Sequence, residues 1–226
     1  PALAETMPPK LVAHTGMDAL THAIEAYVAT ARSEFSDPLA MKAISDIFAY
    51  LLDSYNGCGE ARAKMHYAQC LAGMAFSNAL LGIAHSLAHK TGAMFDIPHG
   101  CCNAILLPYV IKYNATKPTK FASFPKYKEY VADERYAKIA RRVGLCDAKT
   151  PTQEAVDSLI KAIEDLMRAT ERPLSVSACG VSEAEFMSKV DELSYKAFED
   201  QCTTANPVYP LVSEIKELYR EAYYGE

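Results

Sequence analysis

Apolar residues recur at helical spacing along most of this sequence, whereas the strict alternation that marks a half-buried strand is nearly absent. In the segment from Asp18 to Thr30, for example, Leu20, Ile24, Tyr27 and Val28 fall on one stripe of a helix. No internal repeat, low-complexity tract or interdomain linker interrupts this pattern. We therefore predict an all-α multi-helix bundle, with residues 1–226 forming one helical domain.

Start and stop signals predict the other helices. Asp37-Pro38 pairs an N-cap residue with a proline in the first turn, so a helix is expected from there to Tyr55. Further helices are predicted at Glu60 to Leu81, Cys102 to Asn114, Glu134 to Val143, Thr152 to Ala169, Ser182 to Phe198 and, after Pro207 and Pro210, up to about Tyr224. Loops are predicted at Gly92 to Gly100 and, as a surface excursion, at Lys117 to Tyr130. The segment after Glu60 is apolar nearly all round, which predicts a buried central helix.

Composition narrows the class of protein. The 226 residues are 50% hydrophobic, which supports a substantial core, and carry a formal net charge of −5. This acidic balance argues against a nucleic-acid partner. No apolar run approaches the roughly 18 residues of a membrane span, and no signal peptide opens the chain. Since a mature chain seldom begins as this one does at Pro1, we expect a truncated protein.

The cysteines indicate a reducing compartment. The seven residues are Cys58, Cys70, Cys101, Cys102, Cys146, Cys179 and Cys202. They form an odd set without a CxxC pair, which predicts free thiols in a cytoplasmic protein. Two successive side chains rarely face one ion, so Cys101 and Cys102 are predicted to be buried thiols rather than metal ligands.

Histidines concentrate in three short segments. Asp18 and His22 are four residues apart on a predicted helix, a step of about 400° and about 6 Å that keeps both on one face. His85 and His89 repeat this spacing, and His99 follows Pro98 in a predicted turn. Each pair alone is more often a solvated or hydrogen-bonded structural pair. Together, in segments of which two are otherwise apolar, they predict a metal site, because an unpartnered buried imidazole is costly.

The remaining histidines are assigned to structure: His14 is predicted to precede the first helix, and His66 to lie within the long one. Imidazoles with one carboxylate suit iron, zinc, manganese or cobalt, and the sequence does not rank these metals. A nucleotide-binding turn is not predicted, because the closely spaced Gly57 and Gly59 follow a helix and Arg62 stands where a third glycine is needed.

Three longer motifs resemble the iron-containing alcohol dehydrogenases, specifically the C-terminal half of the bifunctional aldehyde-alcohol dehydrogenases. The motifs are GMDALTHAIEAYV (Gly16 to Val28), FSNALLGIAHSLAHKTGAMFDIPHG (Phe76 to Gly100) and DQCTTANPVYPLVSEIKELY (Asp200 to Tyr219). The resemblance implies the dehydroquinate synthase-like helical domain of that family. It departs at Val208, where the family pattern leads us to expect an arginine.

The resemblance also implies roles for particular residues. It implies Asp18, His22, His85 and His99 as ligands of Fe²⁺, with Zn²⁺ as the alternative. It implies that His89 is a catalytic residue that helps proton movement, and that Phe76, Leu81 and Cys202 line the substrate pocket. NAD(H) would be bound mainly by an N-terminal α/β domain that is absent from residues 1–226. The resemblance implies reversible NADH-linked reduction of acetaldehyde or another short aldehyde. It also implies that the full-length protein forms a homo-oligomer or filament.

Three rival interpretations were weighed. A zinc-dependent polyol or glycerol dehydrogenase would share the fold, but the long terminal motif and the excursion after Lys117 favour the aldehyde-alcohol type. A helical phosphohydrolase needs an adjacent His-Asp pair, and no histidine here is followed by aspartate. A non-catalytic helical assembly module would not need Asp18, His22, His85 and His99 at ligand spacing.

Overall fold

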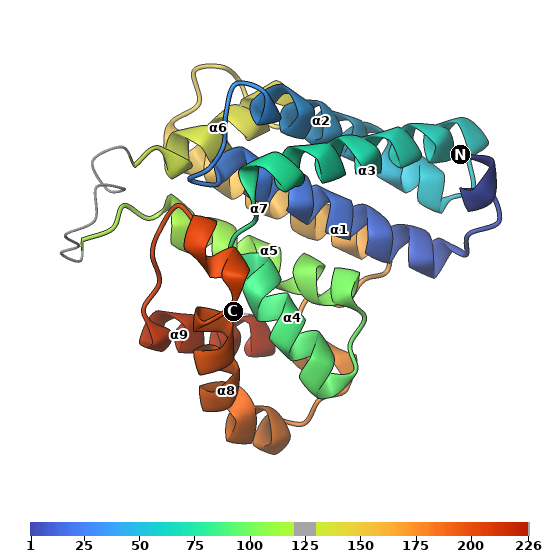
Figure 1. The fold of residues 1–226 in the computed structure, drawn as a ribbon. Coiled ribbons are helices and arrows are strands. Elements are labelled where there is room, and N and C mark those ends of the chain that lie inside the picture. Colours follow the sequence, from blue (N-terminus) through green and yellow to red (C-terminus); the bar gives the residue numbers. More distant parts are fainter. Residues whose placement is uncertain (120–129, 226) are drawn as a thin grey trace.

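The computed structural model describes residues 1–119 and 130–225, and within them every regular element is a helix (Figure 1). The α-helices are α1 (Pro9–Val28), α2 (Ser36–Tyr55), α3 (Gly59–Ala79), α4 (Ile83–Phe95), α5 (His99–Ala115), α6 (Ala132–Arg142), α7 (Thr152–Ala169), α8 (Glu183–Phe198) and α9 (Val212–Tyr224). Short 3₁₀ helices are η1 (Ala2–Ala4), η3 (Ser177–Cys179) and η4 (Gln201–Ala205). The prediction of an all-α fold is confirmed. Residues 120–129 of the predicted excursion lie outside the described part.

Helix α5 is the centre of the fold. It contacts α1, α4, α6, α7 and α9, while α1, α2 and α3 lie side by side above it and α8 and α9 lie below (Figure 1). Nearly all of its residues are buried, including Pro108 inside the helix. A proline there removes one backbone hydrogen bond, and tight packing on all sides offsets that loss. The elements that carry the candidate site, α1, α4 and α5, therefore meet in the core.

The prediction that α3 is a buried central helix is wrong. Its buried residues form one stripe: Ala61, Met65, Ala68, Ala72, Ala75 and Ala79. Tyr67 and Met74 on the other side are 58% and 50% exposed. Small side chains let α3 approach α1 and α2 closely, so the high alanine content reflects close packing on one face rather than burial all round.

A sharp break separates α3 from α4. Leu80 adopts φ 65° and ψ −174°, a region that favours glycine, and the two helices bend by 109°. Among the described residues no single helix is long and apolar enough to cross a membrane, although α3 and α4 reach that length and composition as a bent pair. The break turns the first residues of α4 inward, so that the backbone N–H of Ile83 donates to Asn206 Oδ1 at 3.2 Å.

The predicted loop from Gly92 to Gly100 is mostly helical. Helix α4 continues to Phe95 and ends at Asp96, which adopts a left-handed conformation with φ 53°; α5 begins at His99. Gly92 lies inside α4 because the chain folds back over it. A Cβ there would lie 3.0 Å from the Ile97 carbonyl oxygen. His99 is therefore the first residue of a helix rather than part of a long turn.

His14 lies inside α1, which begins at Pro9, so the prediction that it precedes the first helix is wrong. Its side chain is buried, and its Nε2 accepts a hydrogen bond from Arg172 Nη1 at 3.0 Å. Burial, followed by the nearby charges of Arg172 and Lys10, lowers the pKa of His14 to about 4. The imidazole is therefore neutral in the folded chain near neutral pH.

Because His14 is neutral in the folded chain, we predict that the free energy of unfolding decreases in acid. An exposed histidine in the unfolded chain binds a proton near pH 6.5, so the free energy of unfolding should fall as the pH drops from about 6.5 towards 4. We expect His14→Gln, which keeps an acceptor for Arg172, to reduce the loss between pH 7 and 5 by about 1–2 kcal/mol. Urea denaturation of both proteins with a chelator present measures this, and equal losses would contradict it.

Candidate metal centre

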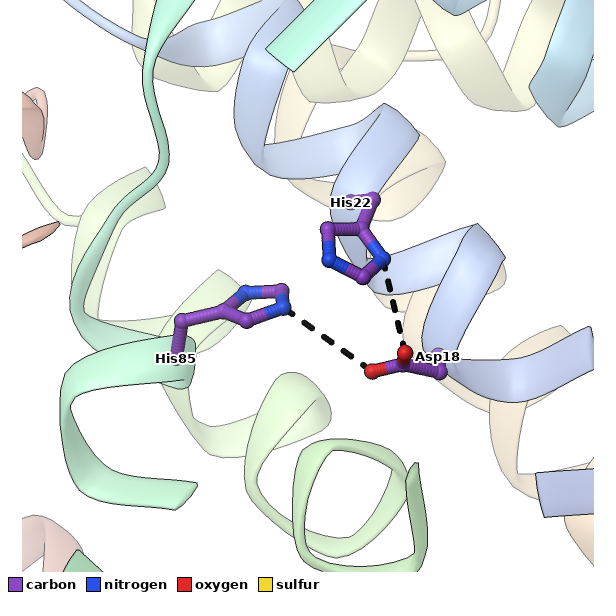
Figure 2. Close-up of side chains that lie close together, drawn as sticks. All are labelled: Asp18, His22 and His85. Carbon is purple, nitrogen blue, oxygen red and sulfur yellow. Dashed lines mark ion pairs between the residues drawn. The ribbon is translucent and has the colours of Figure 1, made fainter. Parts of the chain in front are cut away.

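Three helices bring the predicted ligands to one place. Asp18 and His22 project from successive turns of α1, His85 comes from the first turn of α4, and His99 opens α5. Figure 2 shows the Asp18 carboxylate facing both His22 and His85, with a dashed line to each. One donor atom from each of Asp18, His22 and His85 can be chosen so that all lie within 4.8 Å of one another.

The Asp18 carboxylate is the common neighbour of the imidazoles. Its Oδ2 lies 3.6 Å from His22 Nδ1, and its Oδ1 lies 3.9 Å from His85 Nε2 and 3.3 Å from His99 Nε2. The ring centroids of His22 and His85 are 4.3 Å apart, and those of His85 and His99 are 5.4 Å apart. Residues spread over more than eighty positions of sequence thus form one cluster of nitrogen and oxygen donors.

Two imidazoles of this cluster, His22 and His99, have pKa values below that of free histidine. Burial lowers the pKa of His22 to about 4, helped by the neighbouring His85 and opposed by the Asp18 and Glu25 carboxylates. Burial also lowers the pKa of His99 by more than Asp18 raises it. Neutral imidazole keeps the lone pair that a metal ion needs. Near pH 7, His22 and His99 are therefore in the protonation state that binds metal.

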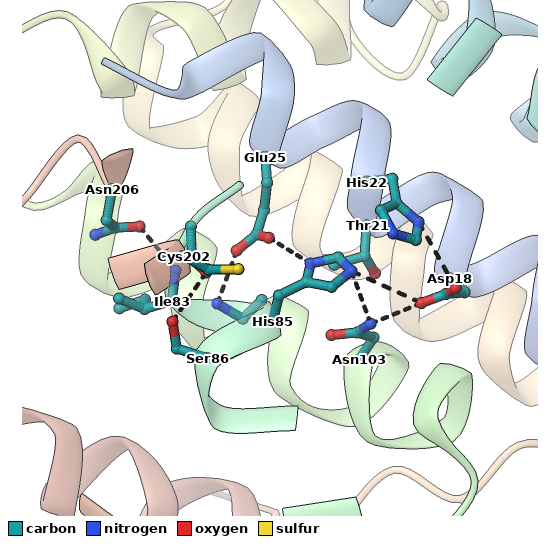
Figure 3. A network of polar contacts seen from close by, with 12 residues as sticks. Asp18, Thr21, His22, Glu25, Ile83, His85, Ser86, Asn103, Cys202 and Asn206 are labelled. Atoms are coloured by element: carbon teal, nitrogen blue, oxygen red, sulfur yellow. Dashed lines mark hydrogen bonds and ion pairs between the residues drawn. The ribbon is translucent and has the colours of Figure 1, made fainter. Parts of the chain in front are cut away.

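Asn103 marks the point on which the donors converge. Its Nδ2 donates to Asp18 Oδ1 at 2.6 Å and lies 3.1 Å from His85 Nε2 (Figure 3). The same Nδ2 lies 3.0 Å from His99 Nε2. Its Oδ1 is buried and finds no hydrogen-bond partner among the described residues. The oxygen of Asp18 and the two imidazole nitrogens all lie around this one amide nitrogen, so their lone pairs face a common point. A carboxylate and imidazole set of this kind fits a divalent transition metal.

A buried carboxylate lies behind His85. Glu25 Oε2 is 2.6 Å from His85 Nδ1, and Glu25 Oε1 accepts from the backbone N–H of Ala84 at 2.7 Å. Glu25 is 2% exposed, and a Cβ on Gly82 would lie only 2.9 Å from its Oε1. The contact assigns the ring proton to Nδ1, which leaves Nε2 free on the side of Asp18.

Glu25 and Asn103 are functional residues that the sequence patterns do not predict. One signal was available for each. Glu25 is a carboxylate within an otherwise apolar stretch, on the helix face that also carries Asp18 and His22. Asn103 follows His99 by four residues and so shares its helix face. Neither spacing identifies the partner residue, because the partners come from other helices.

His89 lies beside the cluster, one turn after His85 on α4. Its ring stacks on His99 with centroids 5.4 Å apart and an interplanar angle of 15°. Its Nδ1 lies 3.1 Å from Asp200 Oδ2, and its side chain is 36% exposed. The side chain thus reaches from the donor cluster towards solvent, as a group that moves protons would require.

The three predicted pocket residues occupy different positions around the histidines. Phe76 stacks on His22 with centroids 4.6 Å apart, and Leu81 lies half-buried in the α3–α4 break. Cys202 is buried in η4 beside His89 and Asp200. Burial and the Asp200 carboxylate raise the pKa of Cys202 to about 12, so its thiol stays neutral and weakly polar.

The adjacent cysteines after this site are not among the donors. Cys101 and Cys102 are free and buried, at 3% and 1% exposure, as predicted. Burial raises the pKa of the Cys102 thiol to about 12. Val208, which stands where an arginine was expected, is also buried, and its carbonyl accepts from Asn206 Nδ2 at 2.6 Å. The side chain at this position therefore packs in the core.

Comparison with known proteins identifies the class. Residues 12–223 match the family described as "Fe-containing alcohol dehydrogenase family, C-terminal". The chain is 55% identical over 223 residues to an NADPH-dependent butanol dehydrogenase of Clostridium saccharobutylicum, covering 99% of this chain and 53% of that protein. It is 45% identical over 227 residues to the bifunctional aldehyde-alcohol dehydrogenase of Escherichia coli K12, covering 99% of this chain and 26% of that protein. The structure of an iron-containing alcohol dehydrogenase from Thermococcus thioreducens matches with a TM-score of 0.85 at 40% identity, covering all of this chain and 54% of that one.

The fold and the site define a class of protein: an all-helical domain in which three helices bring together a histidine and carboxylate cluster. The chain belongs to the iron-containing alcohol dehydrogenase family and corresponds to its C-terminal domain. It spans about half the length of the butanol dehydrogenase and about a quarter of the aldehyde-alcohol dehydrogenases that it matches.

Proposed function

We propose that this chain is the metal-binding half of an alcohol dehydrogenase that uses Fe²⁺ to interconvert a short aldehyde, such as acetaldehyde, and its primary alcohol. The observation that carries the proposal is the convergence of Asp18 with His22, His85 and His99 where three helices of a domain of this family meet. Four protein ligands would close a tetrahedral ion to substrate, whereas ferrous iron accepts five or six ligands. This favours iron over zinc.

The bound ion and the residues around the cluster would have different roles in the reaction. A divalent ion bound by these ligands would supply Lewis-acid polarisation of the substrate oxygen. Phe76, Leu81 and Cys202 would provide an apolar wall that favours a small substrate. His89 would exchange the proton of the substrate oxygen at Nε2 and pass it to solvent through the exposed side of its ring.

The nucleotide would be bound elsewhere. We propose that an N-terminal α/β domain, outside these 226 residues, binds NAD(H) and aligns nicotinamide C4 with the substrate carbon. The butanol dehydrogenase relative is named as NADPH-dependent, so both nucleotides need to be assayed. That domain would dock against the helical domain formed by this chain. The complete protein would assemble into a homo-oligomer or filament.

Activity measurements test the proposal. We expect the 226-residue chain, purified anaerobically with ferrous iron, to show little dehydrogenase activity. A longer protein that joins the chain to its nucleotide-binding domain should reduce acetaldehyde or butanal with NADH or NADPH, and should lose that activity on chelation and regain it with Fe²⁺. Robust NADH turnover by the isolated chain, or full activity of the longer protein after metal removal, would refute the proposal.

A further inference from the structure

The Asp200 carboxylate joins two functional segments of the fold. It lies just before η4, and its side chain is 7% exposed. Its Oδ2 is 3.1 Å from His89 Nδ1 and 2.7 Å from Lys90 Nζ, and its Oδ1 accepts from the backbone N–H of Cys202 at 2.9 Å. Burial alone would raise the pKa of Asp200, but hydrogen bonds from Lys90, Cys202 and His89 hold it at about 2. The group is therefore an ionised acceptor surrounded by three donors.

These contacts determine which nitrogen of His89 carries the proton. An ionised carboxylate only accepts hydrogen bonds, so Nδ1 of His89 donates to it, and in the neutral imidazole the lone pair is then on Nε2. The ring cannot turn freely, because one face stacks on His99 and its edge meets His85 at a centroid distance of 6.0 Å. The contacts with Asp200 and with the two histidine rings together restrict the orientation of His89.

We propose that Asp200 is a positioning residue, which holds His89 with Nδ1 protonated and Nε2 available, while Lys90 keeps the carboxylate aimed at the ring. The proposal rests on the proposed function, in which His89 exchanges the substrate proton at Nε2. It assigns to a residue 111 positions away in sequence the task of orienting His89.

A second metal site is the competing interpretation of the same residues. Donor atoms of His89, Asp200 and Cys202 can all lie within 4.8 Å of one another. However, the Lys90 ammonium already lies against the Asp200 carboxylate, and it would repel a dication. The Cys202 thiol is also protonated near neutral pH, whereas metals bind the thiolate. These charges favour a positioning role.

The tautomer can be observed directly. In the zinc-loaded chain with ¹⁵N-labelled histidine, which is diamagnetic, long-range ¹H–¹⁵N correlations should show Nδ1-protonated His89. We expect Asp200→Asn to convert this signal into a tautomer mixture, and Asp200→Glu to restore most of it. Asp46→Asn is the matched control, because Asp46 is a largely buried carboxylate that pairs with Lys42 at 2.5 Å on α2, away from the site. That control should leave His89 unchanged.

Kinetics of the longer, iron-loaded protein complete the test. We expect Asp200→Asn to lower kcat about 10–100-fold with KM for the aldehyde and iron content within about twofold of wild type, and Asp200→Glu to recover part of kcat. Lys90→Met keeps the carboxylate and should lower kcat less than Asp200→Asn. An unchanged His89 tautomer in Asp200→Asn, or a second zinc equivalent that this variant loses, would overturn the positioning role. An inactive wild type with a single His89 tautomer would count against the proposed function alone.

Discussion

Gly100→Ala is expected to destabilise the folded chain by about 3 kcal/mol, at the upper end of the roughly 1–3 kcal/mol typical of overpacking, because the contact is with rigid backbone. A Cβ on Gly100 would overlap the backbone carbonyl of His14, with the carbonyl carbon 2.8 Å away, and would press against Asp18 Cβ at 3.2 Å. Backbone of α1 cannot move aside as a flexible side chain can. Helices α1 and α5 would have to separate, which would carry His99 away from Asp18. The variant should therefore lose metal affinity as well as stability.

Gly73→Ala is the matched control for this prediction. Gly73 lies within α3, and a Cβ there would meet nothing within 4 Å. Alanine has the higher helix propensity, so this variant should gain about 0.5–1 kcal/mol. Urea denaturation followed by circular dichroism measures both changes. Equal stabilities of Gly100→Ala and wild type would mean that the close approach of α5 to α1 is not required.

Loss of bound iron is the second large effect that we expect. His85→Ala and His99→Ala should each reduce near-stoichiometric iron to a small fraction after anaerobic purification and dialysis. His99 is the cleaner position, because its side chain is 41% exposed, whereas removing His85 also strands the buried Glu25 carboxylate. His66→Ala provides the control, since His66 is exposed on α3. Unchanged iron content with alanine at Asp18, His22, His85 and His99 together would favour a non-catalytic assembly module.

A smaller loss of metal affinity is expected when the residue that hydrogen-bonds to a ligand is changed and the ligand itself is kept. Glu25→Gln keeps the volume of the side chain but removes the charge that faces His85 Nδ1 at 2.6 Å. Changes of this kind typically reduce metal affinity about 10–100-fold. Competition with a chelator of known affinity should therefore rank wild type above Glu25→Gln, and Glu25→Gln above His85→Ala. An unchanged affinity in Glu25→Gln would mean that Glu25 only fills space.

Hydrophobic periodicity and capping signals predict the positions of most helices, because both depend only on residues close in sequence. Helix α7 was predicted to the residue, Thr152–Ala169, because an amphipathic stripe and clear ends coincide. Helix α1 begins earlier than the apolar stripe predicts, because Pro9, a proline in the first turn, is its start signal. Gly92 is typical of a loop in the sequence, but in the structure it serves close packing inside α4. The alanines of α3 indicated an apolar helix but not that only one face is covered.

The candidate site was predictable only in its locally spaced donors. Asp18 and His22 share a face by helix geometry alone, and their meeting with His85 and His99 followed from a motif resemblance. The contacts that orient the donors join distant positions: 60 residues separate Glu25 from His85, and 85 separate Asp18 from Asn103. No periodicity encodes such pairs, because they depend on how the helices pack.

Because the predicted ligands come from three separate helices, metal binding and the stability of the folded chain are linked. If the site binds iron as proposed, residues of α1, α4 and α5 hold the ion together only in the folded chain, so iron supply would shift the balance between native and unfolded molecules. At a free-ion concentration of about 100 times Kd this adds about 2.7 kcal/mol. Oxidation or chelation of the iron would thus expose the protein to heat inactivation and proteolysis, and iron shortage would reduce its abundance together with its chemistry.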